Sequence, residues 1–169
     1  MESSSVPTDA DLAMLATYIA GAMQQHKRML ASAESCTGGW IAKALTDLSG
    51  SSAWFEAGVV SYSNEAKMSL LGVKRETLER TGAVSEATVL EMVSGALERL
   101  HAAVAVAVTG IAGPAGGTPE KPVGTVWIGW QQRGGAAHAQ RFHFAGDREA
   151  IRRQTVAAAL EGVLAILTD

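Results

Sequence analysis

Hydrophobic residues follow two alternating periods along this chain, one typical of helices and the other of strands. Near the N-terminus, residues 8–11 resemble a capping box. The apolar side chains after it share one helical face: Leu12, Leu15, Ile19 and Met23. Residues 28–33 lack this helical spacing and have the length of a short strand. The change of period predicts a helix followed by a strand.

The same alternation continues to the C-terminus. Apolar or alternating stretches predict further strands at residues 57–63, 102–108, 123–132 and 136–144. Helical spacing predicts helices that begin near residues 38, 64, 85 and 147, with Asn64 and Ser85 as caps. The last two strands flank Arg133-Gly134-Gly135, which is typical of a β-hairpin turn.

Strands separated by helices predict an α/β fold, because the helices can serve as crossovers between parallel strands. We therefore expect a three-layer α/β/α sandwich with a mixed, mostly parallel sheet, in which the C-terminal hairpin is antiparallel. A length of 169 residues suits one domain. We expect this domain over residues 8–169, after a flexible N-terminus at residues 1–7.

The composition is that of a globular protein, with 47% hydrophobic and 18% charged residues. Lys and Arg number 14 against 17 Asp and Glu, so the basic excess of nucleic-acid-binding proteins is missing. A single cysteine excludes an intrachain disulfide and cysteine-rich zinc spacing. With no apolar stretch of membrane-spanning length and no signal-peptide features at residues 1–8, we expect a cytoplasmic protein without nucleic-acid or membrane partners.

The most informative segment is AESCTGGW at residues 33–40, a turn between a predicted strand and a predicted helix. It combines a carboxylate, two hydroxyls, a thiol and two glycines. The first amides of a helix have no partner within the helix and attract negative charge, and glycines let a ligand approach the backbone. We expect an oxyanion or phosphate at residues 37–39, with Ser35 beside it. The plainer alternative is that Thr37 only caps the helix and the glycines only form the turn.

Three polar segments follow predicted strands, at residues 34–39, 63–67 and 109–117. Ligands bind at the carboxyl ends of strands in open α/β sheets, so we expect the three segments to converge there. The third segment is glycine-rich and suits backbone contacts to an anion, but it matches neither a dinucleotide fingerprint nor a Walker A loop. A purely structural role for this loop is equally compatible with its spacing. Arg148 opposes the dipole in the first turn of the last helix, which favours a role in anion binding.

Ser35 and Lys67 are the candidate nucleophile and base. None of the four histidines lies near a glycine-rich segment, which disfavours a Ser-His-Asp triad and leaves a serine-lysine pair. Lys67 can accept a proton only if burial or a nearby cation lowers its pKa, and the alternative is a solvated surface lysine. Cys36 is the competing nucleophile. Neighbours that leave a strand point in opposite directions, so we expect Cys36 to pack in the core.

At these residues the chain closely resembles the CinA C-terminal-domain family, over about residues 8–168. Four segments carry the resemblance: AESCTGG at 33–39, SYSNEAK at 61–67, GAVS at 82–85, and VTGIAGPAGGTPEKPVGTVWIG at 108–129. The stand-alone members of this family include nicotinamide mononucleotide deamidases. The resemblance implies a three-layer α/β/α fold and hydrolysis of the nicotinamide carboxamide to give nicotinate mononucleotide and ammonia. It implies no metal and no organic cofactor.

The resemblance also implies roles for individual residues. A Ser-Lys mechanism would be carried by Ser35 and Lys67, with Tyr62 nearby. The backbone at residues 37–39 would hold the oxyanion, and the loop at residues 109–113 would hold the phosphate or ribose. The expected substrate-binding residues are Glu34, Thr37, Gly38, Gly39, Asn64, Thr109, Gly110, Ala112, Gly113 and Arg148.

Two other functions are compatible with the sequence. A non-catalytic nucleotide-binding or regulatory module could share the pocket, and a structural subunit could have inherited it, although binding alone needs neither Ser35 nor Lys67. Small-residue helices and Trp54-Phe55 permit a homo-oligomer, most simply a dimer. A core position for Trp54 is equally compatible with the pattern.

Overall fold

The computed structural model describes residues 5–168, which contain a five-stranded sheet in the order β2-β1-β3-β4-β5. Its strands are β1 (Leu30–Glu34), β2 (Phe55–Val60), β3 (Val104–Gly110), β4 (Thr125–Gln132) and β5 (His138–His143). β1 pairs in parallel with β2 and β3, whereas β4 is antiparallel to both of its neighbours. Of these five strands only β4 runs against the others, so the predicted mixed, mostly parallel sheet and its C-terminal hairpin are confirmed.

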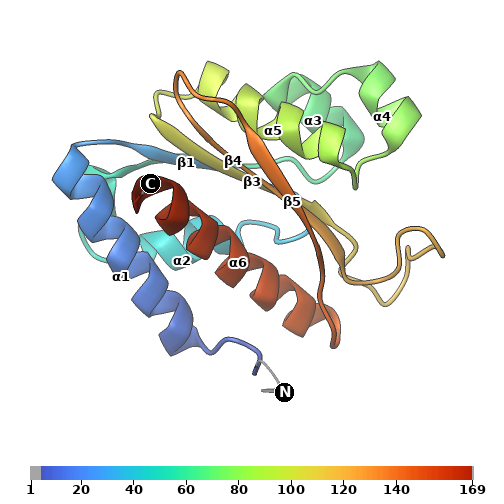
Figure 1. Cartoon of the computed structure of the whole chain (residues 1–169), viewed down its shortest axis with the longest axis horizontal. Coiled ribbons are helices and arrows are strands. Elements are labelled where there is room, and N and C mark those ends of the chain that lie inside the picture. Colours follow the sequence, from blue (N-terminus) through green and yellow to red (C-terminus); the bar gives the residue numbers. More distant parts are fainter. Residues whose placement is uncertain (1–4, 169) are drawn as a thin grey trace.

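Helices cover both faces of the sheet (Figure 1). On one face lie α1 (Asp9–His26), α2 (Trp40–Thr46) and α6 (Arg148–Thr168). On the other lie α3 (Asn64–Leu71), α4 (Arg75–Thr81) and α5 (Glu86–Arg99). This arrangement confirms the three-layer α/β/α sandwich. Within residues 5–168, no helix combines the length and hydrophobicity that a membrane span requires.

Each face of the sheet has its own hydrophobic core. Ile19, Leu45 and Leu160 belong to the core under α1, α2 and α6. Leu71 and Met92 belong to the core under α3, α4 and α5. The central strands β1 and β3 are buried on both faces, which explains the run of small apolar residues in β3, whereas β1 also buries the polar residues Ser32 and Glu34. Trp54 is 1% exposed in the first core. Of its two alternatives, an oligomer contact and a core position, the structure therefore supports the core position.

Side-chain caps determine where several helices begin. Thr8 forms the predicted capping box of α1, and Ser85 caps α5 as predicted. The cap of α3 is Ser63, whose hydroxyl accepts a hydrogen bond from the amide of Ala66. The predicted cap at Asn64 was therefore wrong by one residue. Helix α4 was missed, because Leu78 is its one fully buried side chain and the segment shows no helical period.

The N-terminal prediction meets the structure only in part. Of the flexible segment expected at residues 1–7, residues 1–4 lie outside the described residues. Residues 5–7 precede α1 without regular secondary structure.

The carboxyl ends of β1, β2 and β3 meet at one edge of the sheet. Glu34, the last residue of β1, is in register with Val60 of β2 and Val108 of β3. Beyond it, the amide of Ser35 donates to the carbonyl of Val108, and the amide of Ser61 donates to that of Glu34. The backbone thus brings the three polar segments together, as the topology predicted.

Candidate active site

A cavity of about 280 Å³ opens at this edge of the sheet. All three predicted polar segments contribute to it, and α6 adds Arg148. Its lining residues are Ser35, Cys36, Tyr62, Asn64, Lys67, Ala83, Val84, Thr109, Gly110, Ala112 and Arg148. Ala83 and Val84 were not among the predicted site residues. The signal that could have found them is the segment GAVS at residues 82–85, which carries part of the family resemblance.

Lys67 and Ser35 are in direct contact at the base of this cavity. Residues 61–63 connect β2 to α3, which buries Lys67 so that its side chain reaches back to the end of β1. Lys67 Nζ lies 2.9 Å from Ser35 Oγ. It donates hydrogen bonds to the carbonyls of Ser61, at 2.9 Å, and Tyr62, at 3.2 Å. Ser61 is a further contact that the sequence did not single out.

The Lys67 amine is buried without a counter-charge. The residue is 1% exposed, and within residues 5–168 no carboxylate forms an ion pair with it. Burial therefore lowers the pKa of Lys67 from its usual value, while the nearby Cys36 thiol opposes this shift. A solvated surface lysine is excluded. A lysine amine that is neutral more readily than usual can accept a proton from the hydroxyl 2.9 Å away.

Cys36 is a weak candidate for the nucleophile. Its side chain packs in the core under α1, α2 and α6 and is 7% exposed, but Cys36 also lines the cavity beside Ser35, so the expected separation of the two residues holds only in part. Burial raises the pKa of the Cys36 thiol to about 12, with a smaller contribution from Glu34. The thiolate is the reactive form of cysteine and is therefore scarce at neutral pH. This environment favours Ser35.

Glu34 does not line the cavity that contains Ser35. Its carboxylate is fully buried and turned toward the start of α2. Oε1 accepts hydrogen bonds from Thr37 Oγ1 at 2.5 Å and from the amide of Ile41 at 2.9 Å, and Oε2 accepts from the amide of Ala42 at 3.1 Å. It satisfies helix amides that would otherwise lack partners. The geometry therefore supports a structural role for Glu34 in place of the expected contact with substrate.

The two glycine amides of the turn are already engaged. The amide of Gly38 donates to the carbonyl of Ser35 at 3.1 Å, and that of Gly39 donates to Glu34 Oε1 at 3.2 Å. Thr37, Gly38 and Gly39 line a separate cavity with Trp40, Lys43 and Arg152. Among the described residues, no other residue accepts a hydrogen bond from the amides of Cys36 and Thr37, although the Cys36 amide lies against its own thiol. Of the expected donors at residues 37–39 only the Thr37 amide remains available, and the Cys36 amide was not among those expected.

The wall opposite Ser35 combines an arginine, a tyrosine and the loop after β3. Arg148 Nη1 donates to the carbonyl of Gly113 at 2.8 Å, and its Nη2 lies 3.4 Å from the Tyr62 hydroxyl. Tyr62 is 62% exposed and Arg148 is exposed as well, so both side chains are accessible to a ligand. Thr109 is buried and donates its hydroxyl to the carbonyl of Ala83. Of the predicted loop residues, Gly113 contacts Arg148 and is absent from the lining.

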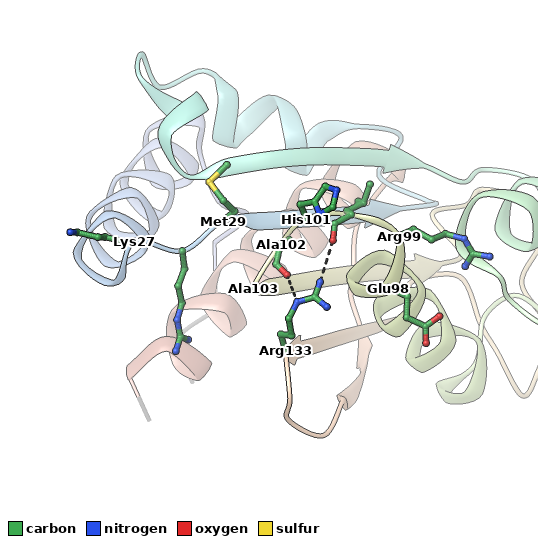
Figure 2. Close-up of a pocket in the computed structure, with 10 residues that line it drawn as sticks. Lys27, Met29, Glu98, Arg99, His101, Ala102, Ala103 and Arg133 are labelled. Carbon is green, nitrogen blue, oxygen red and sulfur yellow. Dashed lines mark hydrogen bonds between the residues drawn. The ribbon is translucent and has the colours of Figure 1, made fainter.

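A second cavity of about 410 Å³ lies at the opposite end of β1 and β3, between residues 27–29, 98–103 and 133. Figure 2 shows Arg133 at its centre, where the guanidinium donates to the carbonyls of Leu100 and Ala102. Lys27 and Arg99 point in opposite directions away from Arg133. This cavity lacks a hydroxyl or thiol in its lining.

Within residues 5–168, no group of three or more His, Cys, Asp or Glu side chains is placed to bind a metal ion.

The fold and the Ser35–Lys67 contact define an α/β protein with a serine-lysine site. The sequence matches the CinA C-terminal domain over residues 12–167, and the chain belongs to this family. It is 51% identical over 154 residues to the nicotinamide-nucleotide amidohydrolase PncC of Escherichia coli, covering 91% of this chain and 93% of that protein. It is also 51% identical over 155 residues to the protein of the same name from Pseudomonas putida, covering 92% of this chain and 96% of that protein.

A solved structure agrees with this assignment. The competence/damage inducible protein CihA from Agrobacterium tumefaciens superimposes with a TM-score of 0.91 at 46% identity, covering 98% of this chain and 99% of that one. A CinA-like protein of Akkermansia muciniphila is 52% identical over 142 residues, which cover 84% of this chain and 34% of that protein. The same domain thus occurs at similar length in some relatives and within a longer chain in others.

The buried Glu34 carboxylate predicts a measurable effect on stability. Glu34→Gln keeps the shape but places an amide group against backbone amides, so that donors face donors. We expect the free energy of unfolding to fall by about 2–4 kcal/mol. The control is Glu65→Gln at an exposed position of α3, which should change it by less than about 0.5 kcal/mol. Urea denaturation at neutral pH measures both, and equal stabilities of the two variants would contradict the structural role.

Proposed function

We propose that this protein is an amidohydrolase that converts nicotinamide mononucleotide to nicotinate mononucleotide and ammonia by a Ser-Lys mechanism. The observation that carries the mechanism is the buried Lys67 amine 2.9 Å from Ser35 Oγ in an open cavity. The substrate is inferred from the relatives named nicotinamide-nucleotide amidohydrolase, to which this chain is 51% identical over more than nine-tenths of their length. Ser35 and Lys67 each lie in one of the segments that carry the family resemblance, AESCTGG at 33–39 and SYSNEAK at 61–67.

The first half-reaction forms an ester between the substrate and Ser35. Ser35 Oγ attacks the carboxamide carbon while the neutral Lys67 amine accepts the hydroxyl proton. The negative charge that develops on the carboxamide oxygen is stabilised by the free amides of Cys36 and Thr37. In other serine hydrolases the residue after the nucleophile supplies such an amide. The intermediate then collapses, the carbon–nitrogen bond breaks, and the Lys67 ammonium returns its proton to the leaving ammonia.

The second half-reaction releases the acid. Lys67, again neutral, takes a proton from a water molecule that attacks the ester carbon. Collapse of the second intermediate breaks the bond to Ser35 Oγ, which recovers its proton from Lys67. The products are nicotinate mononucleotide and regenerated enzyme. Every proton transfer uses Lys67, so the proposed reaction needs neither a metal nor an organic cofactor.

Binding of the mononucleotide is assigned to the wall opposite Ser35. Arg148 is exposed and retains guanidinium hydrogens for the phosphate, and Tyr62 lies beside it for the pyridinium ring or ribose. Asn64, Thr109, Gly110 and Ala112 complete the lining within reach of the ligand. Thr37 supplies a backbone amide in this proposal, whereas Glu34, Gly38, Gly39 and Gly113 support the site from outside the cavity.

A non-catalytic nucleotide-binding module would not need the Lys67 environment. Burying an amine without a counter-charge costs stability, and a binding role for Lys67 would favour the charged form at the surface of the cavity. The catalytic proposal accounts for the burial because a general base must lose its proton near the working pH. For this reason we prefer the enzyme to the regulatory module.

The remaining expectations form part of the same proposal. We assign residues 8–169 to one amidohydrolase domain and place the protein in the cytoplasm, where a phosphorylated substrate is retained. We also propose a homodimer. Exposed apolar side chains on the outer face of α1, Met14 at 50% and Tyr18 at 58%, provide one surface for such contacts. Trp54 has no part in it because it is buried.

The nucleophile can be identified with two neighbouring variants. Ser35→Ala removes the attacking oxygen and should lower kcat for ammonia release from nicotinamide mononucleotide by roughly 10⁴-fold or more. Cys36→Ala removes a packed thiol and should leave kcat within roughly fivefold of the parent, because the backbone amide is kept. Ammonia is measured in a coupled assay, with circular dichroism as a control for folding. An inactive Cys36→Ala together with an active Ser35→Ala would show that Cys36, and not Ser35, is the nucleophile.

The base can be tested through its charge. Because burial lowers the pKa of Lys67, kcat/KM should rise with pH through a pKa below the usual lysine value of about 10.4 and then level off. Lys67→Arg keeps a positive charge that is not lost in proteins, so it should lower kcat by roughly 10²- to 10⁴-fold. A Lys67→Arg variant within a few-fold of the parent would mean that the lysine supplies charge only.

A further inference from the structure

Arg152 of α6 contacts the nucleophile turn from the side away from the cavity. Its Nε donates to the carbonyl of Cys36 and its Nη2 to the carbonyl of Thr37, both at 3.0 Å. The side chain is half-buried, and its guanidinium lies 5.6 Å from the centre of the Trp40 ring. Arg152 lines the separate cavity formed with residues 37–40 and Lys43 and is absent from the lining around Ser35. It is therefore placed to act on the turn and not on a ligand.

Each of these two hydrogen bonds is connected, through one or more peptide groups, to the amide of Thr37 or Cys36. In a trans peptide the carbonyl and the amide hydrogen point in opposite directions. The Cys36 carbonyl shares its peptide group with the amide of Thr37, so a donor on that carbonyl fixes and polarises the Thr37 amide. The Thr37 carbonyl shares its group with the amide of Gly38, which donates to the carbonyl of Ser35. That carbonyl shares its own group with the amide of Cys36.

Arg152 is thus connected to both unpartnered amides through polarised peptide groups. Hydrogen bonds in such chains strengthen one another, particularly where the donor is a cation and water is scarce. The amides of Cys36 and Thr37 become better donors, and their directions are fixed before the substrate binds. Donors that are fixed in advance stabilise the charge of a tetrahedral intermediate without reorganising.

We propose that Arg152 is a positioning residue for the reaction, which orients and polarises the Cys36 and Thr37 amides as the oxyanion site. This inference rests on the proposed function, since it concerns the intermediate formed at Ser35. Its effect belongs to the transition state, where the oxygen carries a full charge, and not to binding of the neutral carboxamide. Loss of Arg152 should therefore change kcat and leave KM almost unchanged.

The test compares two adjacent arginines of α6. Arg152→Gln removes the cation that contacts the turn, and we expect kcat for nicotinamide mononucleotide to fall by roughly 10- to 100-fold with KM within about threefold of the parent. Arg153→Gln is the matched control, because Arg153 also lies against Trp40 but pairs with Asp9 and Glu149. It should keep kcat within roughly twofold of the parent. Both variants are assayed well below their unfolding temperatures.

A third variant separates positioning from a merely structural role. Arg152→Ala leaves space for a free guanidinium ion. Millimolar guanidine hydrochloride should therefore raise the kcat of this variant by roughly fivefold or more. An equal concentration of sodium chloride should not, and neither salt should raise the kcat of Arg153→Gln. If Arg152→Gln does not fold, Arg152→Lys takes its place with the same expected kcat loss, since an ammonium cannot reproduce the planar fork.

Three results would overturn the inference. They are a folded Arg152 variant with the kcat of the parent, a loss that lies in KM alone, and an equal loss in Arg153→Gln. The parent enzyme is assayed first. A parent that releases no ammonia contradicts the proposed function itself, whereas an active parent with unaffected Arg152 variants contradicts only the role of Arg152.

Discussion

The site depends on one electrostatic constraint, an amine buried beside a hydroxyl without a counter-charge. A carboxylate next to Lys67 would hold the ammonium form and remove its basicity. The structure instead surrounds Nζ with two backbone carbonyls and Ser35 Oγ, so the charged form lacks the full solvation that water provides. The fold makes this possible because only residues 61–63 connect β2 to α3 at the carboxyl edge of the sheet. Lys67 thereby reaches Ser35 from within the protein.

The turn that holds Ser35 is fixed by opposite charges from outside the cavity. Glu34 accepts hydrogen bonds from the start of α2, and Arg152 donates to two carbonyls of the same turn. Each of these two charged side chains forms its hydrogen bonds with backbone groups of the turn or of α2. The amides of Cys36 and Thr37 are left free as a result. Both charged side chains therefore act on the backbone of the turn, which we propose contacts the substrate.

Much of this arrangement could be predicted from the sequence, for identifiable reasons. Alternation predicted the hairpin strands β4 and β5, an uninterrupted apolar run predicted the central strand β3, and a period of 3.6 residues predicted the amphipathic helices α1 and α5. Strand order brought the polar segments to one edge, so Ser35 and Lys67 could be paired in advance. Helix α4 was missed because its surface position imposes no clear period.

The details of the turn could not be predicted in the same way. Which amides are free depends on hydrogen bonds from side chains distant in sequence or turned inward. Arg152 lies 115 residues from Thr37 along the chain, and no local pattern indicates such a contact. Glu34 was expected to bind substrate from the family resemblance. Side chains alternate along a strand, and its carboxylate points away from the cavity toward α2.

The most direct measurement is the titration of the Lys67 amine itself. Protein labelled with ¹³C at the lysine ε-carbons can be followed by NMR across the alkaline range, and Lys67→Arg assigns the signal that disappears. The account predicts that this signal titrates at lower pH than those of the exposed lysines, because burial lowers the pKa of Lys67. Titration together with the exposed lysines would contradict it, since the amine would then be charged at working pH and could not accept the proton of Ser35.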